Sequence, residues 1–150
     1  MKGRMKLSDY LSREYVAVLD VDSKRAAIDA VLAILSRHPA IVDAAMLADA
    51  IWQREDALST GIGLGIGVPH VRCACTREAV AALATLRQGI DYGSMDGIPV
   101  RLILMIAMPE GKHKEYLQYL ATACRLFQNK KFRERLFAAR DADELWQAIH

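Results

Sequence analysis

The sequence predicts a single-domain α/β sandwich, a β-sheet covered by helices. Three observations lead to this fold class. Helical patterns come first in the chain, short apolar runs typical of buried strands lie in the middle, and helical patterns return over residues 112–149. The chain has 150 residues, a length typical of one compact domain, and 53% of them are hydrophobic, enough for a substantial core. We therefore treat residues 1–150 as one domain.

The N-terminal part is expected to contain a strand followed by a helix. Residues 1–14 are polar and are expected to form a short arm or an edge element. Residues 15–19, YVAVL, are apolar and rich in valine, which predicts a strand. Ser23 is a suitable N-cap for a helix over residues 24–37, where apolar side chains recur at helical spacing.

A second helix is predicted to begin after Asp43, another suitable N-cap. His38-Pro39 separates the two helices, because the residue before a proline disfavours helical geometry. The apolar face of the second helix is expected to contain Met46, Leu47, Ala50 and Ile51.

Two buried strands and a helical C-terminal part are expected next. Residues 79–86 and 101–108 are continuous apolar runs, as in strands buried on both faces. Residues 89–100 between them are rich in Gly, Asp and Ser, which predicts a turn-rich connection or a hairpin. The helical pattern that follows is expected to break near Asn129 and at Asp141, which is placed to cap a last helix.

Charge and cysteine content narrow the class of protein. Lys and Arg total 20 and Asp and Glu total 18, a net charge of +2 without the basic stripe that nucleic-acid binding requires. The apolar runs fall short of the roughly 20 residues of a membrane helix, and the N-terminus lacks the apolar core of a signal peptide. Three cysteines without a secretory signal argue against a disulfide framework and for a reducing compartment. We expect a cytoplasmic protein without membrane insertion or a nucleic-acid partner.

The most distinctive stretch is STGIGLGIGVPH at residues 59–70. Glycine occupies every second position from Gly61 to Gly67, and Pro69 precedes His70. Residues without a Cβ permit close backbone approach, and uncovered amides can form an anion site. A histidine beside such a surface is suited to a negatively charged group. From spacing alone, a glycine-rich turn that ends in an ordinary surface histidine is an equally open interpretation.

Nucleotide and metal sites fit less well than a reactive histidine. The glycines follow neither the dinucleotide fingerprint nor the phosphate-loop pattern. His70, Cys73 and Cys75 offer ligand types that suit zinc or copper, but the chain has no second ligand pair, so a metal or redox site there is a weaker alternative. Cys124 is expected to behave as a small hydrophobic residue.

His70 fits the role of a nucleophile that takes a phosphoryl group, since neutral imidazole is available near pH 7. Phosphoryl transfer requires positioning and stabilisation of spreading negative charge. This stabilisation could come from the backbone amides of residues 65–68, the Thr60 hydroxyl and the Arg54 guanidinium. Alternatively, Arg54 is an ordinary charged residue near a helix end.

Three stretches carry a resemblance to a known family. They are RE-(x)3-STGIGxGIGVPH at residues 54–70, GIDYGSMDGIPV at residues 89–100, and the helical stretch beginning EYLQYLATACRLF at residue 115. The chain resembles the enzyme IIA domain of bacterial phosphotransferase systems, of the fructose/mannitol type that includes the nitrogen-regulatory proteins. The resemblance covers roughly residues 8–149.

The resemblance implies a mixed β-sheet flanked by helices on both faces, and a phosphotransferase-system activity. His70 would receive its phosphoryl group from a histidine-containing phosphocarrier protein, without nucleotide, metal or other cofactor. Arg54 matches an arginine near the phosphoryl group, and Thr60 matches the threonine of the STG motif. Sugar-transport members pass the group to a cysteine of enzyme IIB, whereas regulatory members bind other proteins according to their phosphorylation state.

We expect a free-standing carrier of the nitrogen-regulatory type, because neither a membrane segment nor a IIB domain accompanies the motif. A sugar-specific enzyme IIA and a regulatory binding module that transfers no phosphate are the alternatives.

The chain departs from the family pattern at three places. Tyr116 stands where a second active-site histidine is usual, and a neutral tyrosine can donate a hydrogen bond but carries no positive charge. His113 lies about one helical turn earlier, so it could substitute or could be a solvated helix residue. Gly67 replaces a common alanine. Arg72, where small residues are usual, could attract phosphate or a partner, or be a plain surface arginine.

Overall fold

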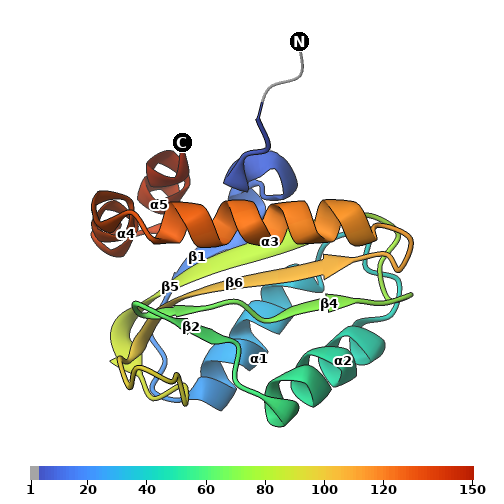
Figure 1. Ribbon diagram of the computed structural model, residues 1–150, viewed down its shortest axis with the longest axis horizontal. Coiled ribbons are helices and arrows are strands. Elements are labelled where there is room, and N and C mark those ends of the chain that lie inside the picture. The colour runs from blue at the N-terminus through green and yellow to red at the C-terminus, as the bar shows by residue number, and fades with distance from the viewer. Residues whose placement is uncertain (1–3) are drawn as a thin grey trace.

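The computed structural model describes residues 4–150, which form a six-stranded mixed sheet between two helical layers (Figure 1). Helices α1 (Lys24–Leu35) and α2 (Ala44–Ala57) cover one face of the sheet. Helices α3 (His113–Phe127), α4 (Lys130–Phe137) and α5 (Ala142–Ile149) cover the other. The predicted fold class, a mixed sheet flanked by helices on both faces, is confirmed.

The sheet has the strand order β1-β5-β6-β3-β2, and β4 pairs with β6 beyond β3. Its strands are β1 (Val16–Leu19), β2 (Gly61–Gly63), β3 (Ile66–Gly67), β4 (His70–Arg72), β5 (Val80–Ile90) and β6 (Val100–Met108). The pairs β1–β5, β3–β6 and β4–β6 are parallel, whereas β5–β6 and β2–β3 are antiparallel. The antiparallel β5–β6 pair confirms the hairpin predicted around residues 89–100.

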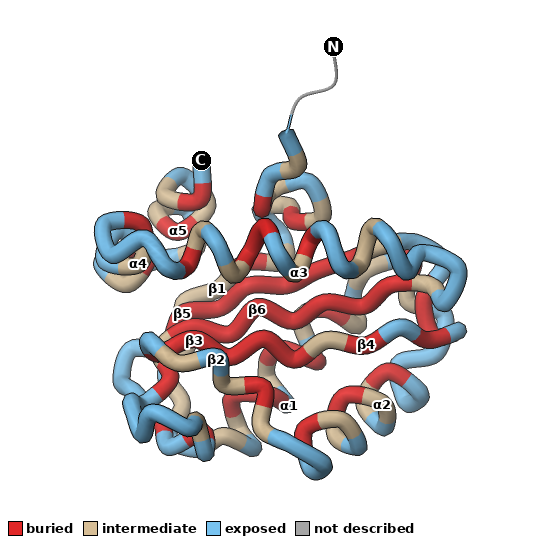
Figure 2. The backbone as a smooth tube through the Cα atoms, in the orientation of Figure 1, coloured by how far each residue is buried: buried red, intermediate tan, exposed pale blue. Residues whose placement is uncertain are grey.

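The core lies on both faces of β5 and β6, whose central residues are buried throughout (Figure 2). This explains why both strands have continuous apolar sequences. Side chains that point alternately to opposite faces separate the core into two clusters, one under α1 and α2 and one under α3, α4 and α5.

Most helix boundaries follow the predicted caps. The side chains of Ser23, Asp43, Asn129 and Asp141 each accept a hydrogen bond from a backbone N–H in the first turn of a helix. The first helix ends at Leu35, two residues before the predicted end at residue 37. None of the helices within residues 4–150 combines the length and apolarity that a membrane span requires.

The N-terminal segment differs from its prediction. Within the described part, residues 4–14 are neither a free arm nor a sheet edge, because they form the short 3-10 helix Leu7–Tyr10 and begin a second one, Arg13–Tyr15. Leu7 and Leu11 are buried in the core beside α3, where the Tyr119 hydroxyl donates a hydrogen bond to the Leu7 carbonyl. Residues 1–3, also part of this prediction, lie outside the described residues.

The glycine stretch forms the β2–β3 hairpin. Gly63 and Gly65 have φ values of 89° and 81°, a region that favours glycine, and Leu64 between them has a φ of 61°. The Val68 amide donates to the Thr60 carbonyl oxygen at 3.0 Å, and the residues before it pair with β2 and β6. The Val68 amide is therefore not free to bind an anion, and residues 65–68 are buried.

Strands β3 and β4 keep one register against β6, although Val68 and Pro69 separate them. Ile66 lies opposite Leu102, and His70 lies opposite Ile106, so neither strand shifts. Ile66 and Val68 belong to the core beneath α3, whereas Val71 and Cys73 belong to the core beneath α2. This alternation directs His70 and Arg72 toward the α3 side of the sheet.

Candidate functional site

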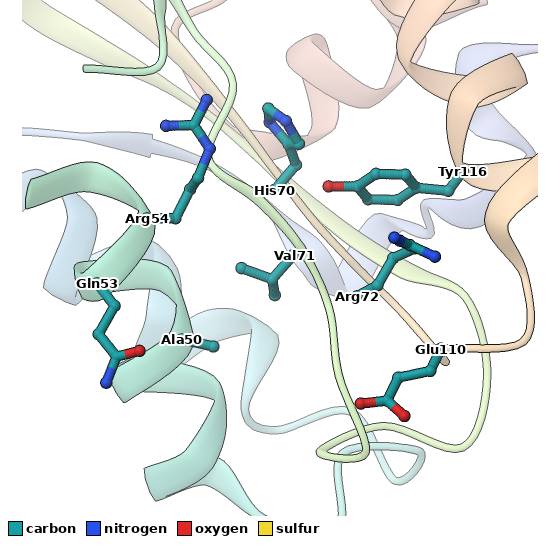
Figure 3. Close-up of a pocket in the computed structure, with 8 residues that line it drawn as sticks. All are labelled: Ala50, Gln53, Arg54, His70, Val71, Arg72, Glu110 and Tyr116. Carbon is teal, nitrogen blue, oxygen red and sulfur yellow. The ribbon is translucent and has the colours of Figure 1, made fainter. Parts of the chain in front are cut away.

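His70 lies in an open cleft at the sheet edge, between the C-terminal half of α2 and the start of α3 (Figure 3). Residues from α2, from β4, from the segment before α3 and from the first turn of α3 form the walls. They are Ala50, Gln53, Arg54, His70, Val71, Arg72, Glu110 and Tyr116. The cleft therefore brings together three of the five site residues predicted from sequence.

The orientation of the His70 ring is set by its own strand. Its Nδ1 lies 2.6 Å from the carbonyl oxygen of Val68, two residues earlier. A carbonyl oxygen can only accept, so Nδ1 carries the proton and Nε2 keeps its lone pair. The backbone thus selects the tautomer in which Nε2 is the nucleophilic atom.

The surroundings of His70 favour its neutral form. Burial lowers the pKa of the imidazole below its usual value, and the positive charge of Arg54 acts in the same direction. The hydrogen bond to Val68 and the negative charge of Glu55 oppose this shift but do not outweigh it. Near neutral pH the ring is consequently available as a nucleophile.

Arg54 projects from the last turn of α2 into the cleft, as the sequence predicted. Its Nη1 donates a hydrogen bond of 2.8 Å to the Leu58 carbonyl oxygen, which ties the guanidinium to the end of its own helix. The guanidinium forms no other hydrogen bond among residues 4–150, so further N–H donors remain for an anion.

Thr60 is not brought into the cleft. Its hydroxyl donates to a Glu55 carboxylate oxygen at 2.6 Å and lies 3.0 Å from the Tyr92 hydroxyl, in a buried network. The Glu55 carboxylate also accepts from the Thr60 amide at 3.0 Å and from Lys24 Nζ at 2.8 Å. Thr60 therefore supports the base of the site through Glu55, which sequence reasoning did not single out.

Tyr116 reaches the site and His113 does not. The Tyr116 ring lies 5.6 Å from the His70 ring, centroid to centroid, and its hydroxyl points into the cleft (Figure 3). Burial raises the pKa of Tyr116, while the charges of Arg72 and Arg54 act in the opposite direction. Tyr116 is thus a neutral hydrogen-bond donor near pH 7. His113, the first residue of α3, is exposed and lies outside the cleft wall.

Two polar residues of the cleft, Gln53 and Glu110, were not considered from the sequence. Arg72, for which attraction of phosphate or a partner and a plain surface position were both left open, also lines the cleft. Arg72 had a signal in the sequence, since a residue two positions after His70 in an extended segment projects from the same face. Gln53 and Glu110 had none, because their approach to His70 depends on how α2 and the segment before α3 pack on the sheet.

The sequence argued against a disulfide framework, but Cys73 and Cys75 form one local disulfide, with their Cα atoms 5.2 Å apart. The chain turns at Ala74 and Cys75 directly after β4, which brings the two residues together. Both sulfurs are used in this bond, and the alternation along β4 places Cys73 on the opposite side from His70. His70, Cys73 and Cys75 therefore do not face one another as a ligand set, and residues 4–150 hold no cluster of three potential metal ligands. Cys124 is a free, partly buried thiol.

Comparison with known families shows which family the chain belongs to. Residues 9–150 match the family model described as "Phosphoenolpyruvate-dependent sugar phosphotransferase system, EIIA 2". The chain belongs to this family. The resemblance noted from the three sequence stretches is confirmed, and it extends over nearly the whole domain.

Relatives of both the sugar-specific and the nitrogen-regulatory kind are similar to the chain. A fructose-specific EIIABC component of Bacillus subtilis is 31% identical over 97% of the chain, which spans only 23% of that longer protein. A nitrogen regulatory protein of Bradyrhizobium diazoefficiens is 29% identical over 97% of the chain and 95% of its own length. The crystal structure of nitrogen regulatory protein IIA-Ntr from Neisseria meningitidis superposes with a TM-score of 0.86 at 28% identity, covering 96% of this chain and 99% of that one.

Proposed function

We propose that this protein is a phosphoryl carrier in which Nε2 of His70 accepts a phosphoryl group from a histidine-containing phosphocarrier protein. The observation that carries the proposal is the hydrogen bond between His70 Nδ1 and the Val68 carbonyl. That bond leaves Nε2 unprotonated in a cleft that also contains two guanidinium groups, those of Arg54 and Arg72. Membership of the EIIA 2 family supports the reaction class.

The transfer needs little beyond positioning and charge. The Nε2 lone pair of His70 attacks phosphorus, the nitrogen–phosphorus bond of the donor phosphohistidine breaks, and the donor imidazole leaves with that electron pair. The proton of His70 stays on Nδ1 throughout and keeps its hydrogen bond to the Val68 carbonyl oxygen. Arg54 lies beside the ring, where its free N–H groups can bind phosphoryl oxygens.

For the role of the phosphorylated protein, we propose nitrogen or metabolic regulation through partner proteins. The chain matches nitrogen regulatory proteins over nearly their full length, at 95% and 99% coverage. A sugar-specific role, with transfer to a cysteine of an enzyme IIB, is the second candidate, because the chain is also 31% identical to part of a fructose-specific component.

The carrier proposal is tested by incubating the protein with enzyme I, the phosphocarrier protein and phosphoenolpyruvate, followed by intact mass spectrometry. Wild type is expected to gain one acid-labile phosphate, and His70→Ala none. His113→Ala is a matched control, because this exposed histidine lies close by in α3 but outside the cleft. Equal labelling of His70→Ala and wild type contradicts the proposal, and an unlabelled wild type favours a binding module that transfers no phosphate.

The role is tested with the phosphorylated protein. A regulatory carrier is expected to retain its phosphate in the presence of enzyme IIB proteins and to bind a target that discriminates between wild type and His70→Ala. Rapid loss of phosphate to an enzyme IIB cysteine would assign the sugar-specific role instead.

A further inference from the structure

Arg72 and His70 form a pair on one side of β4. Two residues apart on a strand that is in register with β6, they project from the same face. Both side chains line the cleft, and Figure 3 shows the Arg72 guanidinium on the side of the cleft nearest to α3. The two side chains therefore face one cleft, the same one that Tyr116 of α3 lines.

The charge of Arg72 is not used elsewhere in the described structure. Among residues 4–150 its guanidinium forms no ion pair and no side-chain hydrogen bond. Glu110 lies in the same cleft wall, but its carboxylate does not pair with Arg72. A guanidinium with all of its donors unused is suited to a dianionic ligand, which it can bind through two parallel hydrogen bonds.

The Tyr116 ring contacts the Arg72 guanidinium. The guanidinium carbon of Arg72 lies 5.6 Å from the centre of the Tyr116 ring, within the range of a cation–π contact. The same ring lies 5.6 Å from that of His70, so one side chain contacts both residues. The Tyr116 hydroxyl forms no hydrogen bond among residues 4–150 and is free to donate.

We infer that Arg72, held by the Tyr116 ring, is a second phosphoryl-binding residue that contacts the group on His70, opposite Arg54. The inference rests on the proposed function. As the Nε2–phosphorus bond forms and the donor nitrogen–phosphorus bond breaks, Arg72 neutralises charge on the phosphoryl oxygens, and Tyr116 donates one neutral hydrogen bond.

The test uses phosphoramidate, a small donor that needs no partner protein. Its phosphorus–nitrogen bond breaks as the bond to Nε2 forms, and ammonia leaves with the electron pair. Arg72→Gln is expected to slow phosphorylation of His70 by about 10- to 100-fold, the range for loss of a charged hydrogen-bonded contact. Arg72→Lys should recover part of the rate, because it restores charge without the planar fork. Arg77→Gln is the matched control, an exposed arginine on the same segment outside the cleft, and should react as wild type does.

Two tyrosine variants separate the ring from the hydroxyl. Tyr116→Phe keeps the ring under Arg72 and should slow the reaction by only about 2- to 10-fold, as for one neutral hydrogen bond. Tyr116→Leu removes both the ring and the hydroxyl. In a Tyr116→Leu background, Arg72→Gln should therefore slow phosphorylation by a smaller factor than it does in the wild-type protein. Thermal melting of each variant establishes that it folds.

Each outcome decides the inference. Slower phosphorylation and faster hydrolysis of phosphohistidine in Arg72→Gln support it. Wild-type rates in Arg72→Gln overturn it while leaving the proposed function of His70 intact. A defect seen with the phosphocarrier protein but not with phosphoramidate also overturns it, because Arg72 would then serve protein docking. A wild type that no donor phosphorylates overturns the proposed function and this inference together.

Discussion

At the residue scale, the chemistry of the site depends on a bond of 2.6 Å between the His70 ring and the Val68 carbonyl. Pro69 separates these two residues, and its fixed φ restricts the backbone that joins them. A short backbone segment thus fixes both the tautomer and the direction of Nε2. No distant side chain is needed to orient the ring.

The lowered pKa of His70 predicts a pH dependence. As pH falls, Nε2 binds a proton and can no longer attack phosphorus. Because burial moves this titration below the usual value of 6.5, phosphorylation should persist to lower pH than in a free histidine. NMR titration of the His70 ring measures its pKa. The rates of phosphorylation by phosphoramidate, measured against pH for the protein and for N-acetylhistidine, measure the pH dependence. A midpoint at or above 6.5 would contradict the prediction.

Sequence reasoning predicted His70, Arg54 and Tyr116 in the cleft because a continuous motif or a family pattern carries them. It also expected Thr60 beside the phosphoryl group, but the same hydroxyl could face the cleft or the core, and packing places it against Glu55 and Tyr92. His113 was ambiguous for a related reason. Helical spacing puts it near Tyr116, but it is the first residue of α3 and remains in solvent.

At the element scale, local signals predicted well and long-range contacts did not. The four side-chain caps act within three residues of the helix they begin, so the sequence contains the whole interaction. Met46 was predicted on the apolar face of α2 but is 42% exposed, whereas Leu47 and Ile51 of that face are buried. Burial of Leu7 depends on Tyr119, which is 112 residues away in sequence.

Gly67 of β3 packs closely against the Tyr92 ring, so a larger residue at this position should destabilise the protein. A Cβ at Gly67 would lie 2.9 Å from Tyr92 Cζ, so the alanine common in the family would collide with this ring. Gly67→Ala is expected to lower the free energy of unfolding by about 1–3 kcal/mol, the usual cost of overpacking. Urea unfolding measures it.

Gly111→Ala provides the control for Gly67→Ala. A Cβ at Gly111 meets nothing within 4 Å, so this change should be near neutral. In a Tyr92→Leu background the cost of Gly67→Ala should shrink, because the ring that it meets is gone. Equal costs in both backgrounds would show that Tyr92 is not the cause.

At the scale of the whole molecule, the buried Glu55 carboxylate ties separate segments together beneath the site. Lys24 of α1 lies 2.8 Å from this carboxylate, and its Nζ also donates to the Tyr92 carbonyl oxygen at 3.1 Å. Thr60 joins the same network from the start of the glycine stretch. The helical layer, the hairpin and the loop after β5 are thereby held in one arrangement around α2, the helix that carries Arg54.

Removing the cation from this network should destabilise the protein. In Lys24→Met the Glu55 carboxylate, only 4% exposed, loses its countercharge, and we expect a loss of about 3 kcal/mol in the free energy of unfolding. The double variant Lys24→Met/Glu55→Gln removes both charges and keeps an acceptor for Thr60, so it should recover much of the loss. Urea unfolding compares them, and a double variant no more stable than Lys24→Met would contradict this account.

The reactive imidazole is anchored on a strand of the sheet, and the cleft above it opens between α2 and α3. In the proposed carrier, a ring anchored in this way cannot swing from one protein to another, so donor and recipient would have to take turns over the same opening. An abundant recipient would then slow loading, and an abundant donor would slow unloading. Transfer through the proposed carrier should follow ping-pong kinetics, with donor and recipient also competing for the cleft.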